Sequence, residues 1–320
     1  MSSAIEAIQT LRRAVLQESE KTVIGQEDAI DGLLVALLAR GHALLEGVPG
    51  TAKTLMARTV ARCLGLDFGR IQFTPDLMPS DVVGTNAWHG PERGFGLVKG
   101  PIFTELLLAD EINRAPAKTQ AALLEAMQER QVSIDGVRHA LGPLFTVFAT
   151  QNPIEHEGTY PLPEAQLDRF LLRIRVDYPS VDDEDRILAR AHAGLASGDP
   201  IEAGVQVVAD RPAIDAARAA GEAIVVDEGI RRYVRDLVRA TRATPMVLLG
   251  AGPRAAVHLL AAARWAAGLG GRAFVTPEDV HRMLEPVLSH RMILAPEVEL
   301  DGLAAREVID RIAGTVEVPR

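Results

Sequence analysis

The chain has 320 residues, enough for more than one hydrophobic core, because single cores stop growing near about 250 to 300 residues. Hydrophobic residues make up 48% of it and charged residues 24%, a composition that excludes disordered and fibrous classes. The formal net charge of −9 offers no long-range attraction to nucleic acid or to an anionic membrane, which weighs against a DNA-binding role.

Neither a membrane span nor export is predicted. The longest apolar runs, such as residues 106–109, fall far short of the roughly 20 residues that a span requires, and the N-terminus lacks a signal-peptide pattern. We therefore expect a cytoplasmic protein. Cys63 is the single cysteine, so a disulfide within the chain is excluded and a buried structural thiol is expected.

The first 178 or so residues alternate short apolar runs with helical patterns, which predicts an α/β fold with a parallel sheet covered on both faces. Functional residues should then cluster at the carboxyl ends of the strands. The five predicted strands, each rich in valine, isoleucine, leucine or phenylalanine, are residues 42–46, 69–74, 105–110, 145–150 and 171–176.

Two insertions interrupt this alternation. Residues 76–103 hold short apolar pieces punctuated by glycines. After a helix predicted at residues 116–130, the alternating flanks of Asp135 and Gly136 predict a β-hairpin within residues 131–143.

After residue 178 the chain changes to alanine- and arginine-rich helical patterns. We therefore predict a core domain over residues 1–178 and an entirely helical domain over residues 179–320, with a loop at about 195–212. Within the second domain, Thr276 begins a helix, and a core-facing stripe of apolar residues runs from Ile230 to Val238.

The first strand leads into a glycine loop and then a helix. This pattern surrounds phosphate oxygens with backbone N–H groups, places a lysine on the β and γ phosphates and a hydroxyl on Mg²⁺. Alanine replaces the second glycine of the general pattern, at a cost of roughly 1 to 2 kcal/mol if that position needs a positive φ. The predicted loop is Gly47, Val48, Pro49, Gly50, Thr51, Ala52, Lys53 and Thr54.

Composition supports a phosphate site. The chain has four lysines against thirty arginines, yet the position that needs a compact charge beside phosphates is Lys53. The alternative is a glycine-rich turn before an amphipathic helix.

The third predicted strand ends in two carboxylates. Asp110 is placed to hold Mg²⁺ through water together with Thr54, and Glu111 to act as general base toward an attacking water. The alternative is an ordinary strand that ends in solvated acids.

The run LADEINRAPAKTQAALLEAMQER at residues 108–130, together with the glycine loop, resembles the MoxR family of AAA+ ATPases. The resemblance is densest over residues 23–178 and implies a P-loop NTPase core followed by an all-α lid domain. That family commonly carries alanine before the lysine, so Ala52 agrees with it.

The resemblance also implies roles for residues outside these two motifs. Ile24 and Gly25 resemble a segment that lies against adenine, although an ordinary loop remains the alternative. Asn152 resembles a polar residue that orients the attacking water; an Asn-Pro turn is its alternative reading.

Two arginines resemble residues that act on the γ phosphate. Arg169 resembles an arginine finger supplied to the neighbouring subunit, the alternative being a surface pair with Asp168. Arg254 resembles a second sensor. It lies in the predicted first turn of a helix, where the macrodipole disfavours a cation, and a nearby phosphate would remove that conflict.

The resemblance implies hydrolysis of ATP, with Mg²⁺, in a ring-shaped homo-oligomer of six subunits. The two inserts would line or rim its pore, and the ring would remodel, mature or activate a client protein, often one with a von Willebrand factor A domain. Three alternatives remain open: a nucleotide-binding scaffold with little turnover, a nucleic-acid-acting AAA+ motor, and a small-molecule kinase that uses the same loop.

Overall fold

The computed structural model describes residues 2–91, 94–152 and 159–319. Its centre is a five-stranded parallel sheet in the order β2-β5-β8-β1-β9, which confirms the predicted sheet. Each observed strand begins and ends within two residues of its prediction. The strands are β1 (Ala43–Glu46), β2 (Phe68–Gln72), β5 (Leu106–Asp110), β8 (Thr146–Gln151) and β9 (Leu172–Arg175).

Helices cover both faces of the sheet, so alternate strand residues are buried on opposite sides. Leu108 and Phe148 face a layer made by α1 (Ser2–Ser19), α2 (Glu27–Leu38) and α3 (Lys53–Cys63). Leu107 and Val147 face α5 (Ala117–Glu129), at the position of the predicted helix. Burial on both faces explains why the strands are apolar throughout rather than alternating.

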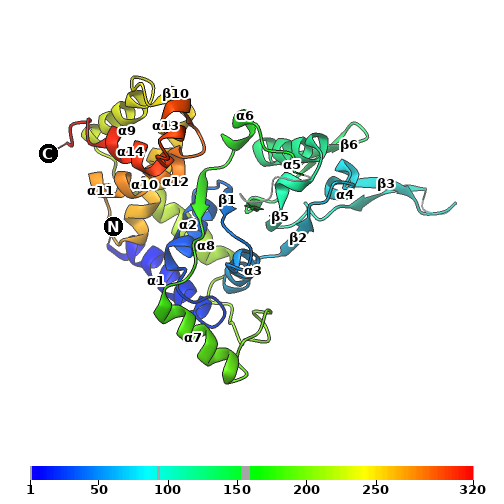
Figure 1. Ribbon diagram of the computed structural model, residues 1–320. Coiled ribbons are helices and arrows are strands. Elements are labelled where there is room, and N and C mark those ends of the chain that lie inside the picture. The colour runs from blue at the N-terminus through cyan, green and yellow to red at the C-terminus, as the bar shows by residue number, and fades with distance from the viewer. Residues whose placement is uncertain (1, 92–93, 153–158, 320) are drawn as a thin grey trace.

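The predicted inserts form two small hairpins beyond this second face. The first insert contains α4 (Pro79–Val83), β3 (Gly84–Trp88) and β4 (Phe95–Lys99); the second is the hairpin β6 (Gln131–Ile134) and β7 (Val137–Ala140). Asp135 and Gly136 both have positive φ, as the predicted two-residue turn requires. Asn86 donates a hydrogen bond of 2.8 Å to Asp135, which joins the hairpins, and β3–β4 extends away from the body (Figure 1).

The C-terminal part is helical, as predicted, except for one small sheet. Thr276 caps its helix, and the stripe from Ile230 to Val238 is buried. The expectation of helices alone is wrong in one detail: β10 (Val247–Leu249) pairs with β11 (Ile293–Leu294), antiparallel strands too short to give a sequence signal. The helices that follow β9 are α7 (Val181–His192), α8 (Arg211–Glu222), α9 (Glu228–Ala240), α10 (Pro253–Leu269), α11 (Pro277–Arg282), α12 (Leu284–Leu288), α13 (Pro296–Leu300) and α14 (Ala305–Ala313).

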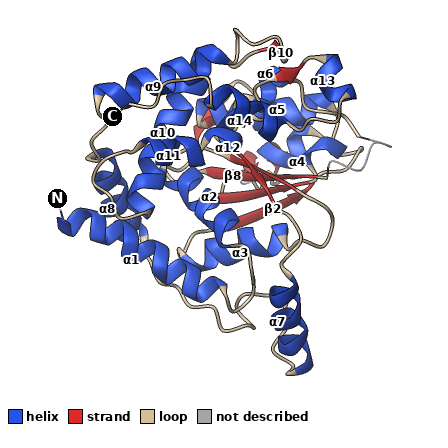
Figure 2. Cartoon of the chain, turned by 60° about the vertical axis from the view of Figure 1, so that its left-hand side comes forward, coloured by secondary structure: helices blue, strands red, loops and turns tan. Residues whose placement is uncertain are grey.

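One helix of this part projects from the molecule. No residue of α7 is buried, and both views show it standing apart at the lower end (Figures 1 and 2). The loop that follows, predicted at about 195–212, returns to α3, where the Val208 N–H donates to the Cys63 carbonyl. Burial raises the pKa of the Cys63 thiol to about 11, in agreement with the expected structural thiol.

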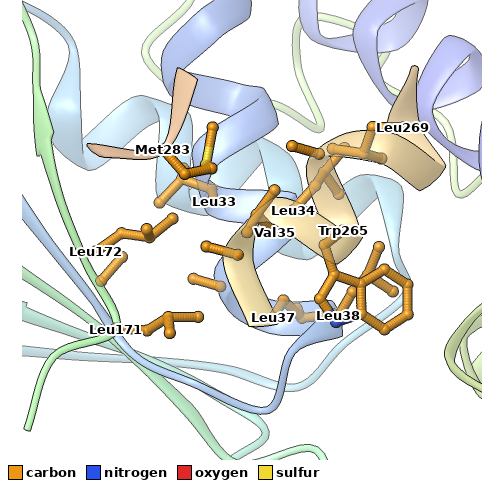
Figure 3. Packing of buried hydrophobic residues seen from close by; sticks show 14 of the residues in the cluster. Leu33, Leu34, Val35, Leu37, Leu38, Leu171, Leu172, Trp265, Leu269 and Met283 are labelled. Atoms are coloured by element: carbon orange, nitrogen blue, oxygen red, sulfur yellow. The ribbon is translucent and has the colours of Figure 1, made fainter. Parts of the chain in front are cut away.

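A single hydrophobic cluster joins the sheet to the C-terminal helices through α1 and α2. Figure 3 shows Leu33 and Leu37 of α2 among Leu171 and Leu172 beside the sheet and Trp265 of α10. Helix α1, which the sequence assigned to the first domain, packs against α8 and α10. Among the described residues, no helix is long and apolar enough to cross a membrane.

Candidate functional site

The sheet order brings the predicted phosphate loop and carboxylates to one edge. Strand β8 lies between β5 and β1, so the carboxyl ends of these three strands are adjacent. The glycine loop follows β1, Asp110 ends β5 with Glu111 directly after it, and Asn152 follows β8. Parallel strands therefore assemble in space what is separated in sequence.

Two glycines shape the phosphate loop. A Cβ on Gly47 would lie 2.2 Å from the Val176 carbonyl oxygen, so only glycine allows the ends of β1 and β9 to come this close. Gly50 has φ +86° and open space around it, a conformation that side-chain-bearing residues rarely adopt.

Ala52 adopts the left-handed conformation that makes alanine costly. Its φ is 60° and its ψ is 21°, at the N-cap of α3. Position 52 therefore has the positive φ on which the predicted cost depends, and Ala52 carries strain of about 1 to 2 kcal/mol. Strain of this kind persists where the surrounding structure enforces it, as it does at many ligand-binding loops.

Lys53 folds back over the loop. Its Nζ donates to the carbonyl oxygens of Gly47 at 2.8 Å and Val48 at 2.7 Å. Burial lowers the pKa of Lys53, and the nearby carboxylates of Asp110 and Glu111 oppose that shift. The ammonium is thus partly withdrawn from water and held by neutral carbonyls, which an anionic phosphate would replace favourably.

Asp110 is buried and accepts hydrogen bonds on both carboxylate oxygens. Oδ2 accepts from Thr54 Oγ1 at 3.2 Å and from Arg70 Nη2 at 2.7 Å, and Oδ1 accepts from Thr150 Oγ1 at 2.5 Å. Thr54 and Asp110, the pair predicted to hold Mg²⁺, are therefore in direct contact.

This oxygen pair fits Mg²⁺, which takes few protein ligands and keeps several waters and substrate oxygens. Within the described ranges, no group of three or more His, Cys, Asp or Glu side chains could hold a metal.

Glu111 lies at the mouth of the site in a strained conformation. Its φ of 56° is left-handed, and its backbone N–H donates to Thr150 Oγ1 at 2.8 Å. Its Oε2 accepts from Gln72 Nε2 at 2.7 Å and from Arg114 Nη1 at 3.1 Å. The carboxylate is partly exposed, so it can reach water beside the loop.

Sequence reasoning missed three residues that hold these carboxylates. Arg70 and Gln72 come from β2, which pairs with β5, and Thr150 comes from β8 on its other side. A polar side chain in an otherwise apolar strand was the available signal, most clearly at Thr150. Which carboxylate each of these side chains contacts, however, depends on the order of the strands in the sheet, and local sequence patterns do not specify that order.

Asn152 and the segment of Ile24 and Gly25 are the other positions predicted to act at the nucleotide. Asn152 is buried at the end of β8, while residues 153–158, and with them the Asn-Pro turn, lie outside the described residues. Ile24 is buried and Gly25 has φ +72°, in a segment that Thr22 joins to α3 through a 2.9 Å contact with Thr59. That segment therefore runs beside the helix that follows the phosphate loop.

The two arginines lie elsewhere. Arg254 Nη1 donates to Asp168 Oδ2 at 3.1 Å, so Arg254 lies beside the turn that carries Arg169. Within the described part of the chain, neither has a hydrogen bond or ion pair to the phosphate loop or to Asp110. The alternative of a pair between Asp168 and Arg169 is wrong, because Asp168 is occupied by Arg254 and Arg291.

Comparison with known proteins agrees with this geometry. Residues 42–172 match the ATPase family associated with various cellular activities (AAA), and residues 239–312 match the AAA lid domain. The chain is 44% identical to Chaperone MoxR1 of Mycobacterium tuberculosis, over 98% of this chain and 83% of that protein. The chain belongs to the MoxR family of AAA+ ATPases.

A second relative and a solved structure extend the match to the whole fold. Protein MoxR of Paracoccus denitrificans is 35% identical over 93% of each chain. A solved structure from Cytophaga hutchinsonii, described as a candidate ATPase, has a TM-score of 0.88 and 40% identity, covering 99% of this chain and 98% of its own. The predicted P-loop NTPase core with a helical lid is therefore confirmed for this MoxR-family protein.

Proposed function

We propose that this MoxR-family chain hydrolyses ATP at the subunit interfaces of a ring-shaped homo-oligomer of six subunits. The proposal rests on the separation in space between the predicted site residues at the sheet edge and the two predicted arginines. Lys53, Thr54, Asp110 and Glu111 share one edge of the sheet, whereas Arg169 follows Asp168, the partner of Arg254 in the lid, and within the described residues neither arginine has a hydrogen bond or ion pair to that edge. A site that needs both groups is complete only when a neighbouring subunit supplies the arginines.

The residues at the sheet edge account for binding and water activation. The N–H groups of the loop and Lys53 would hold the phosphates of ATP, and Thr54 and Asp110 would hold Mg²⁺. Bound there, Mg²⁺ would neutralise charge on the phosphate oxygens. Glu111 would accept a proton from the attacking water, which Asn152 would orient, giving ADP and phosphate.

The arginines would act on the neighbour's nucleotide. The ion pair between Arg254 and Asp168 links Arg254 to the residue that precedes Arg169, so Arg254 lies beside the turn that carries Arg169. We therefore place Arg254 with Arg169 as a group supplied in trans, where each would stabilise charge on the γ phosphate.

The structure is compatible with a lid that moves during turnover. A cavity of about 760 Å³ separates the sheet edge at β9 and α2 from α12 and α14, and it borders Gly47 and Val48 at the start of the phosphate loop. Ion pairs such as Arg282 with Asp28 cross it. Closing or opening of this space is one way in which hydrolysis could change the angle between core and lid.

The work done by the ring is proposed from its relatives. One of them is named a chaperone, which favours remodelling, maturation or activation of a client protein, including clients with a von Willebrand factor A domain. The inserts, joined by Asn86 and Asp135, are the surfaces proposed to meet the client. The cytoplasm stays the predicted compartment.

The experiment that tests the proposal measures the ATPase rate per subunit against protein concentration, together with the particle size in ATP. We expect the rate to rise as rings form. A rate that is independent of concentration in a monomer would contradict the ring mechanism and favour the small-molecule kinase. ATP binding without turnover would favour the scaffold, and stimulation by nucleic acid the DNA-acting motor.

A further inference from the structure

The turn that carries Arg169 is held by the lid rather than by the core. This turn, residues 168–171, joins α6 (Glu164–Leu167) to β9. Helix α6 lies beside the lid in both views (Figures 1 and 2). Three carbonyl groups of the turn and one carboxylate accept hydrogen bonds from a single lid side chain, that of Arg291.

Arg291 is almost fully buried, and its contacts account for its whole guanidinium fork. Nε donates to Asp168 Oδ1 at 2.8 Å, Nη1 donates to the Leu171 carbonyl at 3.3 Å, and Nη2 donates to the carbonyls of Asp168 at 3.3 Å and of Phe170. The neighbouring His290 Nε2 contacts the Phe170 carbonyl at 3.2 Å. The backbone on both sides of Arg169 is thus fixed relative to the end of α12.

The same guanidinium group reaches the helix that carries Arg254. Arg291 Nη2 lies 2.6 Å from His258 Nδ1, and His258 is one turn after Arg254 on α10. Asp168 completes the connection, because its second carboxylate oxygen accepts from Arg254 at 3.1 Å. Arg291 and Asp168 therefore join the turn of Arg169 to the first turn of α10.

We propose that Arg291 and Asp168 form a latch that sets the position of Arg169 according to the position of the lid, so that Arg291 is a positioning residue for the neighbouring subunit's reaction. This inference rests on the proposed function, in which Arg169 acts in trans. The latch touches no nucleotide in its own subunit. Its effect appears only where the turn that it holds meets another subunit's site.

Arginine chemistry supports a positioning role. A guanidinium group offers five donors in a rigid plane and can fix several carbonyls at once, whereas a lysine ammonium is a compact charge on a flexible stem. Replacing Arg291 by lysine keeps the positive charge beside Asp168 but removes the fork. Arg291→Lys thus separates positioning from charge.

The test uses mixed rings with two kinds of subunit. A donor carries Lys53→Ala, which disables its own site but leaves its Arg169. An acceptor carries Arg169→Ala, which leaves a complete phosphate site without a finger. We expect each to be inactive alone and the mixture to regain ATPase activity at interfaces where a donor meets an acceptor.

Arg291→Lys is then placed in one kind of subunit at a time. In the donor we expect kcat of the mixture to fall by about tenfold or more with KM for ATP unchanged, as for a displaced transition-state contact. In the acceptor, which has lost its finger already, we expect less than a twofold change. Asp168→Asn, a milder change that keeps the fork on the carbonyls, should show the same asymmetry to a smaller extent.

A matched control separates this effect from general damage. Arg218 is also buried and donates to a backbone carbonyl, that of Leu37 in α2, and within the described residues it has no hydrogen bond or ion pair to residues 168–171. Arg218→Lys should affect donor and acceptor equally. Equal losses for Arg291→Lys in both positions, or no loss in the donor, would overturn the latch. If the mixture stays inactive with the latch intact, the trans-acting finger is wrong and the latch falls with it.

Discussion

The phosphate loop and the turn of Arg169 are two charged regions built in opposite ways. The loop is one contiguous segment between β1 and α3, and Lys53 bonds to carbonyls only five and six residues away. The turn is held by Arg254 and Arg291, which lie 86 and 123 residues from Asp168 in sequence. A local motif fixes the first region, whereas the packing of the lid fixes the second.

The comparison teaches how the two regions respond to change. The loop and Asp110 can be assembled by the sheet alone, because β1, β5 and β8 are neighbours. The turn needs the lid in place before its ion pairs exist. We therefore expect variants of the turn to affect turnover and its dependence on assembly, and variants of the loop to affect nucleotide binding.

The largest expected effect is that of Arg169→Ala. An arginine finger contributes about 10³-fold or more to kcat, so the rate should fall at least that far while ATP binding is retained. Steady-state turnover measures the rate, and titration with a fluorescent nucleotide measures binding. As a control, Arg175→Ala, at an exposed arginine of β9, should change the rate little. Loss of ATP binding in Arg169→Ala would instead place Arg169 in its own subunit's site.

Glu111→Gln should lower the rate by about 10² to 10⁴-fold, because the amide cannot accept the proton of the attacking water. Unlike Arg169→Ala, this variant should fail at its own site. Adding the Lys53→Ala subunits, which are inactive themselves but keep Arg169, therefore cannot rescue it. Glu129→Gln, at an exposed end of α5, serves as the control. Rescue by such subunits would exclude Glu111 as the general base.

Acidification should weaken the packing around the turn of Arg169. Burial and Arg291 lower the pKa of His258 to about 4, and burial lowers that of His290 further below its usual range, whereas residues 47–54 contain no histidine. Near pH 6.5 these two histidines therefore bind protons in the unfolded chain but stay neutral in the folded chain. Stability from these neutral histidines is complete above about pH 6.5 and is lost as pH falls toward 4, on the order of 2 kcal/mol.

Thermal unfolding measured from pH 7.5 to pH 4.5 tests this dependence. His258→Gln keeps an acceptor for Arg291 but cannot titrate, so its midpoint should fall less steeply with pH than that of the parent chain. Parallel curves for the two proteins would assign the acid sensitivity to other groups.

The smallest expected effect is that of Ala52→Gly. Glycine adopts the φ of 60° without strain but loses more backbone entropy on folding, so we expect a net gain of about 0.5 to 1 kcal/mol in the free energy of unfolding. ATP affinity should stay within twofold. A lower unfolding midpoint, measured by calorimetry, would mean that the methyl group of Ala52 contributes packing that outweighs its strain.

Local patterns in the sequence predicted most of the fold and about half of the candidate site. Apolar runs of buried strands, the Asp135-Gly136 turn and the contiguous glycine loop are local signals, since each depends on neighbouring residues only. They located the five strands, both inserts and the residues from Gly47 to Thr54. The local pattern also identified Ala52 as a costly residue if its φ were positive, and the structure supplies that positive φ.

The contacts between side chains that are far apart in sequence could not be predicted and depend on the tertiary structure. Arg70 and Thr150 reach Asp110 because β2 and β8 flank β5, an order that periodicity does not encode. Arg291 reaches Asp168 because α12 of the lid packs against β9. The physical reason is the same in both cases: an ion pair between residues far apart in sequence forms only after hydrophobic burial has brought their elements together, so no local pattern announces it.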